Sequence, residues 1–186
     1  MICLIAMKKK IKISLIWIIL IIATLLRLIN LGAESIWIDE ATSLYHAQES
    51  FMGNIKWVAS DTNLPLYNIF LWQWIRLFGI SEIAIRSLSV IFGIMSVFMI
   101  YLLGKRLFSK KIGILSAIFL SISSAHLYYS QEARSYSLFI FLSLLSTYFF
   151  YNYLTEKKGR LFYVITTILM IYTHIFSVFV ILIQNL

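Results

Sequence analysis

Two polar stretches in an otherwise apolar chain contain residues that could do chemistry together. Asp39 and Glu40 are adjacent carboxylates, and Glu132 and Arg134 lie far downstream in the sequence Tyr-Ser-Gln-Glu-Ala-Arg. A carboxylate that lies beside another one and is partly removed from water has a raised pKa and can act as a general base. A guanidinium at a bilayer surface is suited to bidentate capture of a phosphate. If both stretches emerge on the same side of a membrane, they form one candidate site.

Each of these residues also has a structural interpretation. Asp39 could cap the amino terminus of a helix that runs to about residue 50, and the dipole of its first turn would then favour Glu40. Capping occupies only one carboxylate oxygen, so it is compatible with a catalytic role. Glu132 and Arg134 could form an exposed ion pair, which contributes little to stability.

The sequence predicts no metal centre. The three histidines share no metal-ligand spacing, and His174 lies in an apolar run where a hydrogen bond in the core is the expected role. Asp39, Glu40 or Asp61 could bind a divalent cation, although carboxylates at a surface are more often hydrated. A single cysteine, Cys3, excludes an internal disulfide and a thiolate metal site.

The composition is that of an integral membrane protein. Hydrophobic residues make up 61% of the 186 residues, charged residues only 13%, and the mean hydropathy is +0.88. The net charge of +8 lies largely in short clusters between apolar runs, which membrane topology explains better than nucleic-acid binding does. The chain has neither of the glycine-rich phosphate-binding motifs of nucleotide-binding proteins.

The apolar runs predict an all-α polytopic membrane protein, a single domain over residues 1–186, with about five transmembrane helices. A cleaved signal peptide is the alternative for the first run, but no A-x-A-like cleavage site follows it. Basic clusters between the runs place the amino terminus in the cytoplasm and both polar stretches outside the plasma membrane. The predicted spans are 13–29, 86–103, 112–128, 136–154 and 161–184.

Residues 30–85 form the predicted outer loop, the only long hydrophilic segment. An amphipathic helix over 66–78 should start just after Pro65. With about 13 residues at 1.5 Å each it is too short to cross a membrane, so we expect it to lie in the interface. Lys56, Asp61 and Asn63 in the same loop either bind a polar ligand or face water.

The chain resembles the GT-C membrane glycosyltransferases of the dolichyl-phosphate-mannose protein mannosyltransferase type, glycosyltransferase family 39, over about residues 13–186. Four segments carry the resemblance: Trp-Ile-Asp-Glu at 37–40, Asp-Thr-Asn-Leu-Pro-Leu-Tyr at 61–67, Leu-Phe-Gly-Ile-Ser-Glu-Ile-Ala-Ile-Arg at 77–86, and the Tyr-Ser-Gln-Glu-Ala-Arg-Ser-Tyr box at 129–136. The second segment departs from the family, which often has His-Pro where this chain has Asn-Leu. We expect the amino-terminal part of a GT-C fold.

The resemblance implies a transferase that moves a sugar from a polyprenyl-phosphate donor to an acceptor hydroxyl outside the membrane. Asp39 would be the general base, with Glu40 supporting it. Arg134, with Glu132 beside it, would neutralise the departing phosphate. Because the leaving group is already an anion, a fixed cation helps most in the transition state and no acid is needed.

The resemblance also places Asp61, Asn63, Tyr67 and Gln131 in the segments that meet the substrates. It does not say which sugar moves, or whether the acceptor is a protein, a lipid or a glycan. Two alternatives stay open. One is a transport subunit that binds a lipid headgroup through Arg134 without chemistry, and the other is a non-catalytic truncated paralogue.

Overall fold

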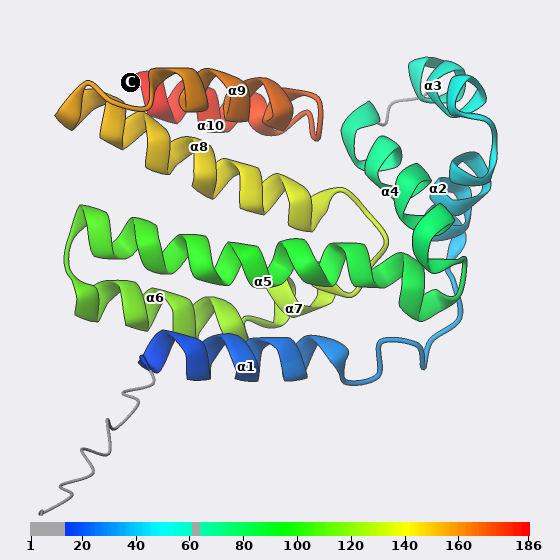
Figure 1. The fold of residues 1–186 in the computed structure, drawn as a ribbon, viewed down its shortest axis with the longest axis horizontal. Coiled ribbons are helices and arrows are strands. Elements are labelled where there is room, and N and C mark those ends of the chain that lie inside the picture. The colour runs from blue at the N-terminus through cyan, green and yellow to red at the C-terminus, as the bar shows by residue number, and fades with distance from the viewer. Residues whose placement is uncertain (1–13, 61–63) are drawn as a thin grey trace, which may run out of the picture.

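A computed structural model describes residues 14–60 and 64–186, so Asp61 and Asn63 lie outside the described residues. Every regular element in the described part of the chain is a helix. Four helices lie side by side as a bundle (Figure 1). They are α1 (Leu15–Leu28), α5 (Glu82–Leu107), α6 (Lys110–Ile122) and α8 (Tyr136–Glu156). The all-α class expected from the sequence is therefore confirmed.

Three shorter helices pack together at one end of the bundle: α2 (Ile38–Gln48), α3 (Phe51–Ser60) and α4 (Pro65–Phe78) (Figure 1). The amphipathic helix expected over 66–78 is α4. It begins with Pro65 in its first turn and ends at Gly79, whose φ of +84° favours glycine. The structure adds α3, which the sequence analysis did not predict.

The prediction that Asp39 caps the first of these helices is wrong. Trp37 occupies the N-cap position of α2 and makes no side-chain capping bond, and Asp39 is the second helical residue. The physical reason is a stronger competitor: the Asp39 carboxylate is paired with a guanidinium instead of a backbone N–H.

Within the described ranges 14–60 and 64–186, two helices are long and apolar enough to cross a membrane, and a bent pair adds a third candidate. With 26 residues, α5 is about 39 Å long, and α8 with 21 residues is about 32 Å long. The third candidate is α6 followed by α7 (Ser124–Ser130), with a bend of 64° between them. In the described residues α1 has 14 residues, or about 21 Å. Five full spans are therefore not confirmed.

The fifth predicted span, 161–184, is two helices rather than one. Helix α9 (Arg160–Ile171) is followed by a turn, and α10 (Ser177–Asn185) runs back alongside α9 (Figure 1). The polar side chain of Gln184 helps to hold the return, because its Nε2 donates to Ser146 Oγ at 3.2 Å and to Thr147 Oγ1 at 3.1 Å on α8. Folding back lets this amide bond to protein instead of facing lipid.

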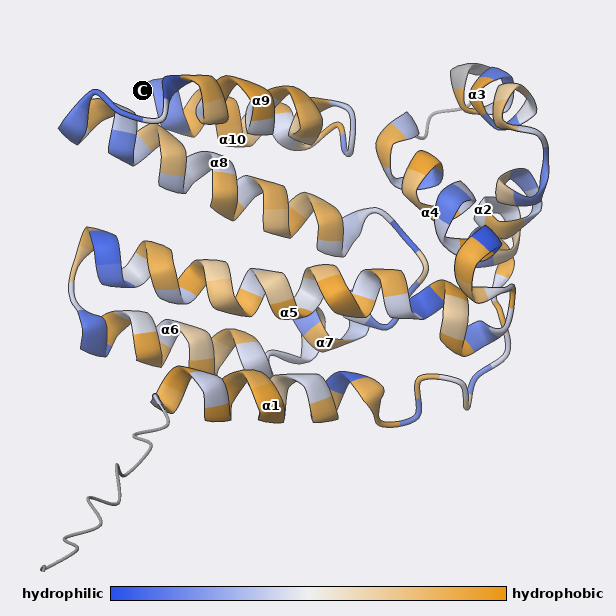
Figure 2. Ribbon diagram, in the orientation of Figure 1, coloured by the Kyte–Doolittle hydropathy of each residue, from blue (hydrophilic) through white to orange (hydrophobic). Residues whose placement is uncertain are grey.

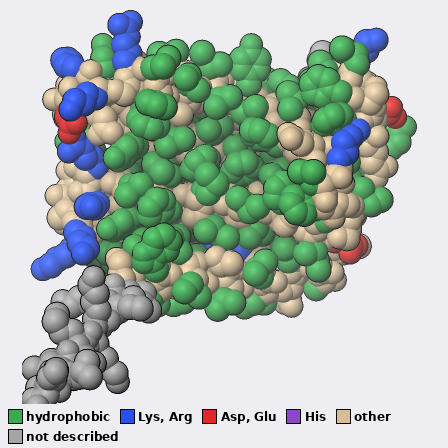
Figure 3. Space-filling model, in the orientation of Figure 1, with side chains coloured by type: hydrophobic (Ala, Val, Ile, Leu, Met, Phe, Trp, Pro, Cys, Tyr) green, Lys and Arg blue, Asp and Glu red, His purple; other side chains and the backbone are tan. Residues whose placement is uncertain are grey.

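Basic residues gather at the end of the bundle opposite α2–α4. The turn from α5 to α6 carries Lys105, Arg106 and Lys110, and the turn from α8 to α9 carries residues 157–160 (Figure 2). Hydrophobic side chains cover most of the face between the two ends (Figure 3). The molecule thus has a basic end, an apolar middle and a second polar end built by α2–α4.

Candidate functional site

The ion pair between Asp39 and Arg134 is the centre of the second polar end. Arg134 Nη1 lies 2.8 Å from Asp39 Oδ2, and the side chains are 18% and 44% exposed. Asp39 comes from the first turn of α2, and Arg134 comes from the segment 131–135 between α7 and α8. The structure therefore brings the two polar stretches of the sequence into direct contact.

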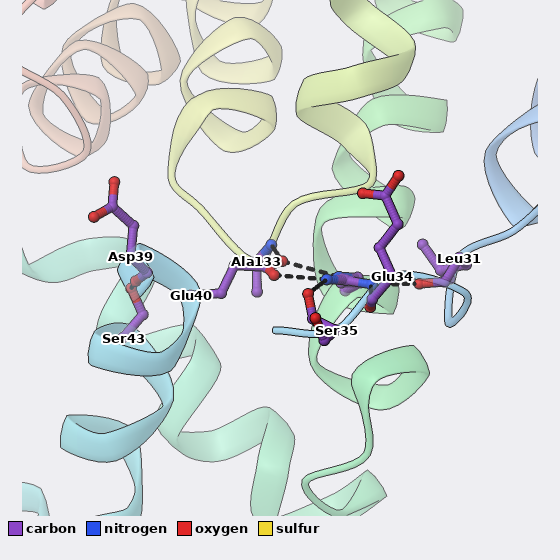
Figure 4. A network of polar contacts seen from close by, with 8 residues as sticks. Leu31, Glu34, Ser35, Asp39, Glu40, Ser43 and Ala133 are labelled. Atoms are coloured by element: carbon purple, nitrogen blue, oxygen red, sulfur yellow. Dashed lines mark hydrogen bonds and ion pairs between the residues drawn. The ribbon is translucent and has the colours of Figure 1, made fainter. Parts of the chain in front are cut away.

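Glu40 has a different position from its neighbour. Its carboxylate is fully buried, and it accepts from Arg86 Nε at 2.9 Å, from Arg86 Nη2 at 2.7 Å and from the Ala133 N–H at 2.8 Å. These contacts join α2, α5 and the segment 131–135 (Figure 4). Glu40 therefore fixes the backbone around Asp39.

Arg86 uses all of its hydrogen-bond donors inside this network. A guanidinium has five N–H groups. Two bind Glu40, and the other three donate to the carbonyl oxygens of Leu31, Glu34 and Ser35 at 2.9, 2.9 and 3.4 Å. Arg86 thereby ties the segment 31–35 to the start of α5.

Tyr67 and Gln131, predicted to meet substrate, make hydrogen bonds that hold the backbone of the site, and their contact with substrate stays a prediction. The buried Tyr67 hydroxyl lies 2.9 Å from Ser89 Oγ, which donates to the Arg134 carbonyl at 3.3 Å. Gln131 Nε2 donates to the carbonyls of Arg27 and Ile29 at 3.1 and 2.8 Å. Both residues therefore position the segment that carries Arg134.

Glu132 is not an ion-pair partner of Arg134 among the described residues. The residue is only 7% exposed, and burial raises its pKa above 4.5. A hydrogen bond from Tyr128 and the charge of Arg134 partly offset this rise, and the charges of Glu40 and Asp39 reinforce it. Glu132 faces a cavity of about 630 Å³, whereas Arg134 lines a separate, much smaller hollow with Ser43 and Tyr67. Glu132 and Arg134 thus line different hollows, although the Arg134 charge still acts on Glu132, and their joint role at a phosphate stays a prediction.

The larger cavity is bounded by the end of α1, the segment 29–37, and α7. Glu40 and Arg86 form part of its wall. Figure 4 places Asp39 and Glu34 on opposite sides of Glu40 and Ala133. The residues that line the cavity are Leu26, Ile29, Asn30, Leu31, Glu34, Ser35, Trp37, Glu40, Arg86, Leu127, Tyr128, Gln131 and Glu132.

Several contributors to this end of the molecule were not identified from the sequence. Arg86 lies in one of the four segments that carry the family resemblance, but no role was predicted for it. A cation at the start of an apolar run indicates that the residue has a partner within the protein. Arg27, fully buried in α1, donates from Nη2 to His126 Nδ1 at 2.7 Å. An arginine inside an apolar helix usually has a specific partner, so the position of Arg27 in an apolar run could have identified it from the sequence.

No group of three or more His, Cys, Asp or Glu side chains within residues 14–60 and 64–186 is arranged to hold a metal ion. Asp61, one of the three carboxylates considered for a divalent cation, lies outside the described residues. Asp39 and Glu40 are each engaged by an arginine.

Residues 62–183 match the family model for dolichyl-phosphate-mannose-protein mannosyltransferase. The chain belongs to this mannosyltransferase family. Its motifs had indicated the same family, and that resemblance is confirmed. An uncharacterized protein of Aquifex aeolicus (strain VF5) is 26% identical over 153 residues, which cover 78% of this chain and 31% of that protein. The chain thus spans less than a third of that relative's length. No solved structure matches this chain.

The matched part of this mannosyltransferase-family chain begins after Asp39 and Glu40. Both carboxylates nevertheless contact the matched part, Asp39 through Arg134 and Glu40 through Arg86. The site is therefore built where the segment before the match folds onto the matched helices.

Proposed function

We propose that this chain carries the base and the phosphate-binding cation of a membrane glycosyltransferase. The enzyme would move a sugar from a polyprenyl-phosphate donor to an acceptor hydroxyl at the outer face of the plasma membrane. The observation that supports this most directly is the 2.8 Å contact between Asp39 and Arg134. Family membership supports the reaction class.

The ion pair is a resting state that donor binding would exchange. In this state the Asp39 carboxylate neutralises Arg134, and a carboxylate engaged by a guanidinium is a weak base. A donor phosphate offers Arg134 a bidentate anionic partner. Once Arg134 binds that phosphate, Asp39 is released and becomes free to accept a proton.

The sugar is then transferred in a single displacement step. The acceptor hydroxyl gives its proton to Asp39, and its oxygen forms a bond to the anomeric carbon of the sugar. The bond between that carbon and the phosphate oxygen breaks, and its electron pair leaves with the polyprenyl phosphate. Arg134 stabilises the charge that develops on this leaving group, which is where a fixed cation lowers the barrier.

The arrangement of the helices supports the proposed orientation. The basic turns between α5 and α6 and between α8 and α9 lie at the end opposite the site, as inner loops would. Helix α4, with exposed Leu77 and Phe78, would lie at headgroup depth. A polyprenyl tail could then stay in lipid while its phosphate reaches Arg134.

Asp39→Asn tests the proposal in membranes that contain the full protein. We expect this variant to insert normally and to lose transfer of mannose from polyprenyl-phosphate-mannose to membrane acceptors. Glu49→Gln, an exposed carboxylate at the end of α2, is the matched control and should keep wild-type transfer. Retained transfer in Asp39→Asn would refute the role of Asp39. Donor binding without turnover in the wild type would instead favour a non-catalytic or transport role.

A further inference from the structure

The smaller hollow beside Arg134 is formed where α2, α4 and the start of α8 meet. Its lining residues are Ser43, Leu64, Tyr67, Asn68, Arg134 and Ser135. Its volume of about 10 Å³ is the room of about one water molecule, so it can take a single oxygen atom but not a sugar ring. None of these described lining residues is acidic, whereas Glu34 and Glu132 line the larger cavity. The smaller hollow therefore suits an anionic oxygen better than the larger cavity does.

Arg134 has hydrogen-bond donors left for a ligand in this hollow. Its Nη1 is paired with Asp39, and its Nε and Nη2 make no hydrogen bond to another described residue. Arg86, by contrast, uses all five of its N–H groups within the protein. Of these two arginines, only Arg134 can still bind an anion.

Asn68 offers a second donor to the same hollow. The residue is only 5% exposed, and its backbone carbonyl accepts from Asn54 Nδ2 at 3.4 Å. Its side-chain amide, however, has no hydrogen-bond partner among the described residues. A buried polar group without a partner is costly, and an asparagine amide carries two N–H donors. Because Asn68 lines the hollow, an anion bound there would supply the missing partner.

Two helices also begin at this hollow. Leu64 and Ser135 are the N-cap residues of α4 and α8, and neither side chain caps its helix. The first-turn N–H groups of a helix lack partners within the helix and form the positive end of its dipole. In α4 one of them, that of Leu66, donates to the Tyr172 carbonyl at 3.0 Å. The Ser135 hydroxyl makes no hydrogen bond to another described residue, so it is available as a further donor.

We propose that the smaller hollow is an oxyanion site that holds one non-bridging oxygen of the donor phosphate. Asn68 Nδ2 and Ser135 Oγ donate to this oxygen beside Arg134, and the positive ends of α4 and α8 face it. The inference rests on the proposed function, whose phosphate site it completes. Because the hollow has room for one oxygen only, the sugar and the polyprenyl tail lie outside it.

The oxyanion site is in direct contact with the proposed base. Arg134, which lines the hollow, lies 2.8 Å from Asp39 Oδ2. Ser43, on the opposite wall, donates from Oγ to the Asp39 carbonyl at 3.0 Å, and both residues lie on α2 (Figure 4). A phosphate held here is therefore next to the residue that would take the proton from the acceptor.

Calorimetric titration of the full chain with farnesyl phosphate, in a detergent without phosphate, tests the oxyanion site. Asn68→Ala should weaken binding about tenfold, as expected for loss of a hydrogen bond to a charged group. Asn68→Asp should weaken it further, because a carboxylate repels the phosphate. Ser135→Ala should weaken binding about threefold, the lower end for a hydrogen bond. The matched control Asn185→Asp, exposed on α10 and outside the hollow, should change nothing.

Two measurements guard these expectations. Circular dichroism shows which variants are folded, and Ser135→Ala decides the question if the buried Asn68 cannot be replaced, because its hydroxyl makes no bond within the described chain. Competition then identifies the bound group: inorganic phosphate should displace farnesyl phosphate, and farnesol should not.

Other outcomes overturn the inference. Unchanged binding in the folded Asn68 and Ser135 variants would leave Arg134 alone as the phosphate ligand. Equal competition by farnesol would show that the tail is bound, and equal competition by phosphatidylglycerol would assign the hollow to a bilayer phospholipid. The proposed function fails separately: transfer that survives Asp39→Asn would reject the base and leave the oxyanion site in place.

Discussion

Glu40→Gln should destabilise the protein strongly although Glu40 is not the proposed base. The substitution keeps the shape of the side chain and removes its charge, which leaves the buried Arg86 guanidinium without its paired carboxylate. Two of the three hydrogen bonds that Glu40 accepts come from Arg86, and hydrogen bonds to charged groups contribute about 1.5–3 kcal/mol each. Breaking a buried ion pair from one side costs about 3–5 kcal/mol. We expect a loss of about 3 kcal/mol, because glutamine can still accept one of these bonds.

Chemical unfolding in mixed micelles, followed by helical circular dichroism, measures this loss. Glu49→Gln is the control, and a change within about 0.5 kcal/mol is expected for this exposed side chain. The double variant Glu40→Gln with Arg86→Met should be less destabilised than the sum of the two single variants, because the charge left unpaired by one change is removed by the other. A loss below about 1 kcal/mol in Glu40→Gln would refute the reasoning that this pair holds α2, α5 and the segment 131–135 together.

Three further predictions concern other parts of the molecule. Burial raises the folded-state pKa of Glu132 above 4.5, so this residue contributes stability at acidic pH that is lost as pH rises through that pKa. In Glu132→Gln, the free energy of unfolding should therefore change less with pH over this range. Gly113→Val should destabilise the packing of α6 on α5 by about 1–3 kcal/mol, because a Cβ there would lie 2.5 Å from the Tyr101 carbonyl oxygen, and unchanged thermal stability would contradict this. Leu186→Cys should react with impermeant thiol reagents only from the basic end of the bundle, whereas labelling from the side of Asp39 would show that α9 and α10 form one continuous span.

The sequence alone predicts the helices that are determined by residues close together in the chain. Apolar runs and the position of Pro65 predict α5, α8 and α4 because hydropathy and proline geometry act over a few residues. The return of the chain between α9 and α10 was missed because the run has no glycine or proline to mark a turn. It is stabilised by contacts of Gln184 with α8, which lie far apart in sequence.

The candidate site was predictable as a set of residues but not as a geometry. The motifs selected Asp39, Glu40, Glu132 and Arg134, yet nothing in them says that Asp39 pairs with Arg134 while Glu132 faces another compartment. The burial of Glu40 against Arg86 depends on how α2 docks on α5, which is a tertiary property. Adjacent carboxylates in a sequence therefore need not share a task.

If the proposed function holds, the ion pair between Asp39 and Arg134 would also influence the affinity for the donor. A phosphate that takes over the Arg134 N–H groups now paired with Asp39 would spend part of its binding free energy on that exchange. Asp39→Asn would remove the competitor together with the base. The variant that cannot turn over should therefore retain lipid phosphate longer than the active protein, which makes it the form in which to trap the loaded complex.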